Sequence, residues 1–148
     1  MEYTYAVNIA KYDEIHAHLV RCNASFVPPL DSRVVLEDYA RKLVSAATRY
    51  EAWAEESVIG LVAIYANDPT KREAFITDVS VEEAHGNQGI AQKLLRQCIE
   101  ETGKQGFQTI VLEVSRTNHL AMELYRKLGF VLHAELQGDS VKLALQLT

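Results

Sequence analysis

A glycine-rich turn joins a strand-like stretch to a helix-like stretch and carries the clearest chemical pattern in the sequence. A strand that turns directly into a helix points unpaired backbone N–H groups at one spot, and the helix dipole adds positive potential there. Glycine permits close approach of a ligand, and asparagine tolerates the left-handed backbone region. The turn is therefore expected to bind an anion such as a diphosphate. Its residues are Gly86, Asn87, Gln88, Gly89, Ile90 and Ala91.

The turn alone is equally compatible with a simple capped helix. It has no Gly-Lys-Ser/Thr, which a P-loop needs, and it lacks the fuller glycine pattern and later acidic residue of a dinucleotide site. A second sequence signal is needed to distinguish an anion site from a plain turn.

That second signal is Asn118-His-Leu-Ala-Met-Glu-Leu-Tyr-Arg-Lys-Leu-Gly-Phe130. It resembles a signature of the GNAT N-acetyltransferase superfamily, Asn-x-x-Ala-x-x-x-Tyr-x-x-x-Gly-Phe. The glycine turn resembles the other signature, Gln/Arg-x-x-Gly-x-Gly/Ala, with Gly89 and Ala91 at the two small-residue positions. The resemblance covers Ala74 to Val131, and two signatures at the right separation are far more specific than either alone.

The turn departs from the family pattern at two positions. Gly86 stands where the family has Gln or Arg, and Asn87 stands where it has glycine. Since backbone amides bind the phosphates, we expect the site to survive with weaker or reshaped diphosphate binding.

The resemblance implies that acetyl-CoA is the co-substrate and that its acetyl group moves to a primary amine by direct attack. It also implies that Tyr125 reaches the CoA sulfur, where a phenol of pKa ~10 can protonate the departing thiolate. Asn118 is expected to hydrogen-bond the pantetheine arm, or to serve only as a helix N-cap. Val79 and Val81 are expected to pair through their backbones with the pantetheine amides.

The general base stays open among three candidates. Glu113 lies in the middle of a predicted strand, in Leu112-Glu-Val114, and resembles a glutamate used by some ribosomal-protein acetyltransferases of the family. Asp78 adjoins Val79, close to the expected position of the thioester. A chain of water molecules is the third candidate.

The elements that must position these residues follow from hydrophobic periodicity. These elements predict an α/β fold in the broad sense (α+β). The sheet is expected to be mixed, mostly antiparallel and flanked by helices, and the chain is expected to form one domain over residues 1–148. The expected order is β-α-α-β-β-β-α-β-α-β-β. Strands are predicted at 3–7, 49–54, 58–65, 74–81, 109–115, 130–135 and 141–147, and helices at 12–24, 33–47, 89–103 and 119–128.

Three helical details are specific enough to check. The first helix should bury Ile15, Leu19 and Val20 on one face. Asp31-Ser32 should cap the second helix. The helix after Asn118 should bury an apolar stripe that includes Leu120.

Composition narrows the class of protein further. The chain has 148 residues and a formal net charge of −5, which argues against nucleic-acid binding and is compatible with a cationic or neutral acceptor. No apolar run is long enough to cross a membrane, and the N-terminus lacks a secretory pattern, so a cytoplasmic protein is expected.

Cys22 and Cys98 are expected to be reduced, with Cys98 buried. His16 and His18 should point to different helix faces, so no metal site is expected.

The sequence determines the acceptor of the acetyl group least well. The first candidate is a small-molecule amine such as an amino sugar or a polyamine. The second candidate is the N-terminus of a protein, which Leu112-Glu-Val114 suggests. A non-catalytic module that senses acyl-CoA is the alternative from another class, and a homodimer stays open. Candidate acceptor contacts, which could equally belong to the core, are residues 26–30, Tyr39, Arg49, Tyr50, Trp53, Tyr65 and residues 137–140.

Overall fold

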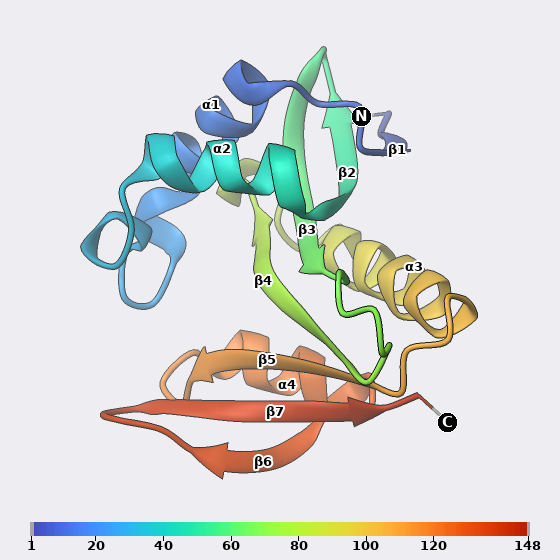
Figure 1. The fold of residues 1–148 in the computed structure, drawn as a ribbon. Coiled ribbons are helices and arrows are strands. Elements are labelled where there is room, and N and C mark those ends of the chain that lie inside the picture. The colour runs from blue at the N-terminus through green and yellow to red at the C-terminus, as the bar shows by residue number, and fades with distance from the viewer. Residues whose placement is uncertain (1, 148) are drawn as a thin grey trace.

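The computed structural model describes residues 2–147, which form one seven-stranded sheet with helices on both faces (Figure 1). The predicted order of strands and helices is confirmed, as is the mixed α/β fold class. The strands are β1 (Thr4–Val7), β2 (Thr48–Ala54), β3 (Ser57–Tyr65), β4 (Glu73–Val81), β5 (Thr109–Ser115), β6 (Val131–Glu135) and β7 (Ser140–Gln146). The helices are α1 (Tyr12–Cys22), α2 (Leu36–Ala46), α3 (Ile90–Lys104) and α4 (His119–Lys127), with short 3-10 turns at Asn23–Ser25, Leu30–Ser32 and Glu83–His85.

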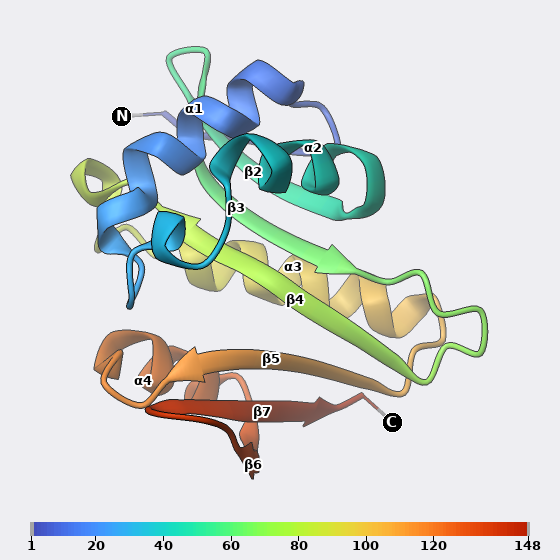
Figure 2. The same ribbon diagram turned by 60° about the vertical axis from the view of Figure 1, so that its left-hand side comes forward.

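The sheet opens between its fourth and fifth strands. The strand order is β1-β2-β3-β4-β5-β7-β6, and only β4 and β5 run parallel, because α3 carries the chain back between them. Their pairing stops at Ile76 and Leu112. Beyond that point the two strands diverge, which Figure 2 shows as a widening separation toward the ends that carry the glycine turn and α4.

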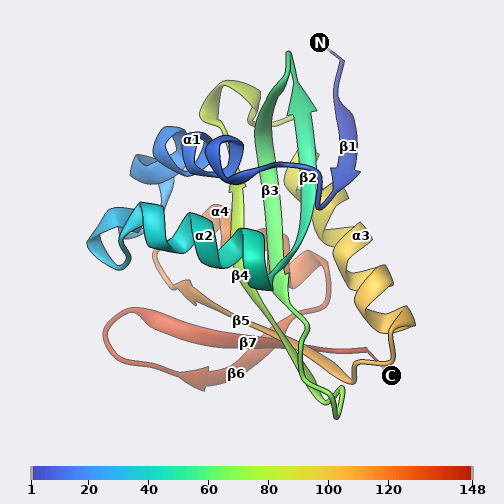
Figure 3. The same ribbon diagram turned by 45° about the horizontal axis from the view of Figure 1, so that its top comes forward.

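Two apolar layers cover the two faces of the sheet. Helices α1 and α2 lie on one face, and α3 and α4 lie on the other (Figure 3). On the α3 face, Gly60 of β3 lets the helix approach closely, because a Cβ there would lie 2.9 Å from Cγ2 of Ile90 and 3.3 Å from Cβ of Ala52. This close packing places the first turn of α3 against β3.

A β-bulge in β4 changes which of its side chains face α1 and α2. Ile76 pairs with Ile64 and Asp78 pairs with Ala63, so Thr77 is an extra residue in the ladder. Because side chains alternate along a strand, the extra residue reverses the pattern. Ile76 therefore packs in the α3 layer, whereas Asp78 points toward the α1 side of the sheet.

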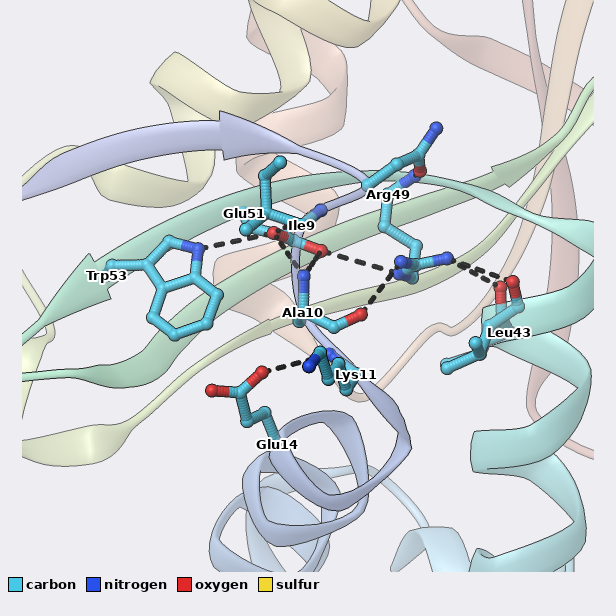
Figure 4. A network of polar contacts seen from close by, with 10 residues as sticks. Ile9, Ala10, Lys11, Glu14, Leu43, Arg49, Glu51 and Trp53 are labelled. Atoms are coloured by element: carbon cyan, nitrogen blue, oxygen red, sulfur yellow. Dashed lines mark hydrogen bonds and ion pairs between the residues drawn. The ribbon is translucent and has the colours of Figure 1, made fainter.

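A buried ion pair ties the N-terminal half together (Figure 4). The Glu51 carboxylate is 0% exposed and accepts hydrogen bonds from the backbone N–H of Ile9 and Ala10 and from Nε1 of Trp53. Arg49 Nε lies 3.4 Å from it, and the Arg49 guanidinium donates to the carbonyls of Leu43 and Val44 in the last turn of α2 and to Ala10. Arg49 and Trp53, candidate acceptor contacts from sequence, thus fasten α1 and α2 to β2.

The burial predicted for α1 is confirmed at Ile15 and Leu19 but wrong at Val20, and that predicted for α4 is wrong at Leu120. Val20 is 50% exposed, because the buried face of α1 consists of Ile15, His18, Leu19 and Cys22. Leu120 is 88% exposed at the start of α4.

The predicted cap of α2 is also wrong. The helix begins at Leu36, after a 3-10 turn over Leu30–Ser32, and the Ser32 hydroxyl donates to the carbonyl of Pro29 instead of capping.

The cysteine prediction is confirmed. Cys22 and Cys98 are both free and buried. Burial raises the pKa of each thiol to about 12, so neither is a reactive thiolate. Across residues 2–147 there is no helix with the length and apolar character needed to cross a bilayer.

Candidate active site

A groove runs along the open edge of β4, from the glycine turn to the point where β4 and β5 meet. It consists of three hollows of about 200, 290 and 200 Å³. The first two share Val81, Ala91 and Leu124, and the last two share Val79 and Asn118, so the three are continuous. We call this the β4 groove and its three parts the turn end, the middle and the inner end.

The turn end is built from backbone amides. Asn87 (φ 62°) and Gly89 (φ 72°) take left-handed conformations, and the first intrahelical bond of α3 runs from Lys93 N to Gly89 O. Among the described residues, nothing accepts a hydrogen bond from the N–H groups of Asn87, Gln88 or Gly89. With the N–H groups of the first helical turn, at Ile90 and Ala91, they form a concave donor surface at the positive end of a helix dipole.

Gly86 is the exception in this turn. Its N–H already donates to the carbonyl of Glu83, because Gly86 ends the 3-10 turn before α3. Neighbouring His85 is held by Tyr3, whose hydroxyl lies 2.9 Å from its Nδ1. Gly86 therefore shapes the turn end without offering a free amide.

The middle of the groove follows the unpaired edge of β4. Between Thr77 and Val81 no strand within residues 2–147 pairs with this edge on the β5 side, so alternate peptide groups face the groove. Val79 and Val81 line it, as does Asn118. The Asn118 side chain also caps α4, because it accepts a hydrogen bond of 3.3 Å from Ala121 N. Asn118 is thus both the N-cap of α4 and part of the groove wall.

Asp78 lies at the inner end and is 2% exposed. Its Oδ1 accepts a hydrogen bond of 2.7 Å from Ser80, and its Oδ2 has no partner among the described residues. Burial raises the pKa of the Asp78 carboxyl to about 7, against the opposing effects of Ser80, Tyr39 and the positive charge of Arg33. A carboxyl with a pKa near neutrality and a free oxygen is suited to accept a proton.

Tyr125 lies at the same inner end, 6% exposed. Burial and the nearby Asp78 raise the pKa of its phenol above the ordinary value, so the hydroxyl keeps its proton near neutral pH. The end of α4 holds the ring in place through a Schellman motif, with Phe130 N bonded to Tyr125 O and Gly129 N bonded to Arg126 O. Gly129 has φ 102°, and the Phe130 ring packs edge-on against the Tyr125 ring at 5.8 Å between centroids.

Glu113, the other candidate base, also lines the inner end but is exposed to solvent. The structure therefore brings Asp78, Glu113, Val79, Asn118 and Tyr125 together around one hollow. Of the aromatic residues considered for the acceptor, Phe26 lines this hollow, whereas Tyr50 is buried in the core.

Sequence reasoning missed three residues of this region: His18, Ser80 and Arg33. His18 could have been found, because residues 15, 18, 19 and 22 have the i, i+3, i+4, i+7 spacing of a buried helix face. Ser80 follows Asp78 by two positions and so shares its side of the strand. Arg33 lies in the connection between α1 and α2 and gave no sequence signal. In the described part of the chain, no group of three or more His, Cys, Asp or Glu could hold a metal ion.

Known proteins resemble this chain in sequence and in fold. Human N-acetyltransferase 8B is 40% identical over 82 residues, which are 53% of this chain and 36% of that protein, so the chain spans about a third of this relative's length. The [ribosomal protein bS18]-alanine N-acetyltransferase of Escherichia coli K12 is 38% identical over 58 residues, 39% of each chain.

Solved structures share the fold over nearly the whole chain. The crystal structure of the ribosomal-protein-S18-alanine N-acetyltransferase from Escherichia coli has a TM-score of 0.78 at 21% identity, covering 99% of this chain and 95% of that one. YncA from Salmonella typhimurium, solved with acetyl-CoA, has a TM-score of 0.76 at 19% identity, covering 100% and 95%. The family model described as "Acetyltransferase (GNAT) family" matches residues 12–130. This chain therefore belongs to the GNAT acetyltransferase family.

Proposed function

We propose that this chain is an N-acetyltransferase that moves the acetyl group of acetyl-CoA to a primary amine by direct attack. One observation carries the proposal: a single groove joins a turn of free backbone amides to a buried carboxyl and a buried phenol. Acetyl-CoA has a diphosphate, an extended arm with two amides and a thioester in the same order. A donor with three consecutive parts therefore suits a groove with three consecutive parts.

Each part of the groove suits one part of the donor. The amides of residues 87–91 would bind the diphosphate. The open edge of β4 at Val79 and Val81 would pair with the pantetheine amides as an added strand does, and Asn118 would contact the same arm. The thioester would then lie at the inner end beside Asp78 and Tyr125. YncA, with the same fold and acetyl-CoA bound, supports this donor.

The chemistry follows from the protonation states of the two buried groups. The amine nitrogen attacks the thioester carbonyl carbon, the new N–C bond forms and the C–S bond breaks. Asp78 takes the proton that the amine nitrogen loses, and Tyr125 gives its proton to the departing sulfur. Returning one proton from Asp78 to Tyr125 restores the enzyme, and the products are an N-acetyl amide and the CoA thiol.

A small-molecule amine is the acceptor we favour. The inner end has a volume of about 200 Å³ and is bounded by Phe26, Val27, Pro28 and Arg33 from the connection between α1 and α2. A hollow of this size accommodates a compact amine. The 38% identity to a ribosomal-protein alanine N-acetyltransferase supports the N-terminus of a protein as the second candidate.

Two measurements on the purified protein test the proposal. A thermal-shift titration with acetyl-CoA is expected to raise the melting temperature, since a ligand that binds only the folded state stabilises it. A thiol-release screen over amino sugars, polyamines and peptides with free N-termini should then identify the acceptor. No stabilisation by acetyl-CoA would refute the proposal, and stabilisation without thiol release from any acceptor would favour the acyl-CoA sensor.

The general base is tested by comparing two carboxylates of the same hollow. Asp78→Asn is expected to lower kcat by about 10²-fold or more, the usual contribution of a general base. Glu113→Gln should have the smaller effect, because its carboxylate is solvated. The reverse order of effects would assign the base to Glu113.

A further inference from the structure

A chain of buried polar groups leads from Asp78 through Ser80, which lines the middle of the β4 groove, into helix α1. Ser80 Oγ lies 2.7 Å from Asp78 Oδ1, and His18 Nε2 lies 2.9 Å from the same Ser80 oxygen. At the far end, His18 Nδ1 lies 3.0 Å from the carbonyl oxygen of Val58. His18 is 0% exposed, and Ser80, which also lines the middle of the β4 groove, is 8% exposed.

The number of available protons determines which hydrogen bonds these polar groups can form. A carbonyl oxygen only accepts, so Nδ1 of His18 carries a proton toward Val58. Burial lowers the pKa of the His18 imidazole to about 4, which makes it neutral and leaves its Nε2 as an acceptor. Ser80 has one hydroxyl proton for two neighbours. Both contacts of Ser80 are hydrogen bonds only when Asp78 carries a proton on Oδ1.

The ionised carboxylate has a less complete chain. It accepts the Ser80 hydrogen bond, and the lone pair of His18 Nε2 then faces the Ser80 oxygen without a hydrogen between them. The donor that remains for Nε2 is the weak S–H of Cys22, 3.7 Å away. Losing a full hydrogen bond at a buried acceptor is costly. The chain therefore favours the protonated form of Asp78.

Other charged and titratable groups face these polar contacts from the surrounding elements. Arg21, from α1, donates to Val58 O and pairs with Glu82 at 2.9 Å, and Cys22 Sγ lies 3.7 Å from His18 Nε2 with its thiol pKa raised to about 12. On the other sides of Asp78 lie Arg33, whose charge is permanent, and the phenols of Tyr39, Tyr65 and Tyr125, whose pKa values burial raises. Glu113, on β5, lines the same hollow.

We infer that His18 is a positioning residue that stabilises the proton taken up by Asp78, acting through the Ser80 hydroxyl in a hydrogen-bond chain that ends at the Val58 carbonyl. The role of Asp78 as the base rests on the proposed function. The proton leaves the amine nitrogen and arrives at the unpartnered Oδ2. A half-turn about the terminal torsion of the side chain, which is broad for a carboxyl, brings it to Ser80. The Ser80 hydroxyl then turns from Asp78 to His18, and no proton leaves the chain.

The inference predicts shifts of opposite sign for two variants. In His18→Leu the Ser80 hydroxyl donates to Asp78 without competition, so the ionised form gains and the pKa of Asp78 falls. In Ser80→Ala the carboxylate loses its donor, so the pKa of Asp78 rises. Each shift is expected to be about one pH unit, a tenfold change in proton affinity.

The experiment follows the side-chain carboxyl carbon of ¹³C-labelled aspartate by NMR in the unliganded full chain between pH 5 and 9. Asp78→Asn assigns the resonance. His16→Leu, on the same helix, and Ser45→Ala, on α2, are the matched controls and should leave the midpoint unchanged. Ser80→Thr keeps a hydroxyl and should keep the wild-type midpoint, so the serine position remains a complete test when His18→Leu does not fold.

Two results would overturn the inference. One is the same midpoint in Ser80→Ala as in the wild type. The other is a ¹⁵N spectrum that places the His18 proton on Nε2, because the imidazole would then donate to Ser80. Shifts of the expected sign without acetyl transfer to any amine would support the chain and refute the proposed function. Acetyl transfer without these shifts would support the proposed function and refute the inferred hydrogen-bond chain.

Discussion

Replacing Asp78 with asparagine removes a carboxyl whose charge is poorly solvated in the fold. The pKa of this carboxyl is about 7 in the folded protein, against an ordinary value of 3.8. A group whose pKa is raised by folding stabilises the folded state most below its unfolded pKa, and that contribution is lost as the pH rises through the folded value. The wild-type protein should therefore lose stability between about pH 4 and pH 7, in the direction opposite to ordinary paired carboxylates.

The size of the effect follows from the shift. A shift of about 3 units corresponds to on the order of 4 kcal/mol at ~1.36 kcal/mol per unit, of which about 2.5 kcal/mol falls between pH 5 and pH 8. Asp78→Asn has no such dependence. Relative to the wild type, the free energy of unfolding of Asp78→Asn should thus be about 2.5 kcal/mol higher at pH 8 than at pH 5, which means a more stable variant.

Urea unfolding of both proteins at pH 5 and pH 8, without acetyl-CoA, measures this double difference. All other titrating groups occur in both proteins and cancel in the comparison. A difference between variant and wild type that is equal at the two pH values would mean that Asp78 is not held as a poorly solvated carboxyl. The same variant should be nearly inactive, so stability and activity are expected to change in opposite directions.

Four other substitutions test further parts of the structure. Tyr125→Phe should lower kcat by about 10²-fold or more while calorimetry shows unchanged CoA affinity, and an unchanged kcat would remove this phenol as the acid. Gly60→Ala forces a Cβ to within 2.9 Å of Ile90 Cγ2 and should cost about 1–3 kcal/mol in urea unfolding, whereas Gly103→Ala, with open space around it inside α3, should stabilise by ~0.5–1 kcal/mol. Glu51→Gln leaves the buried Arg49 charge without its partner and should cost about 3 kcal/mol or more, measured in the same way; a loss below ~1 kcal/mol would contradict the buried ion pair.

Local patterns in the sequence were enough to predict the elements of this fold. The strand at Thr109–Ser115 has the predicted bounds, because its alternation of apolar and polar residues is regular. The turn at Glu55-Glu56 between β2 and β3 was predicted as well, and both residues take the left-handed conformation. Helix bounds differ by a few residues, as at α2, where a 3-10 turn replaces the expected first turn.

The arrangement of the site depends on contacts that no local pattern contains. The sequence places Asp78 on a strand, but only the extra residue at Thr77 decides which face it occupies. His18 reaches Ser80 across 62 positions of the chain, and the pKa of Asp78 follows from burial by elements that are distant in sequence. Periodicity predicts that a residue is buried; it does not predict which polar group it meets there.

The bulge at Thr77 has a consequence for the evolution of this site. Along β4 it acts as a change of phase, so one strand supplies apolar side chains to the α3 layer before the bulge and polar ones to the α1 side after it. Deleting Thr77 would leave Ile76 and Asp78 as neighbours in a regular ladder, in which neighbours already face opposite sides, so Asp78, Val79 and Ser80 would keep their present faces. Straightening the strand with Thr77 retained would instead exchange the faces of every later residue. Asp78 and Ser80 would then enter the apolar layer, and Val79 would lie on the α1 side. The loss of one residue at this point is thus compatible with the site, whereas a slip of one position in the pairing of β4 with β3 would dismantle it.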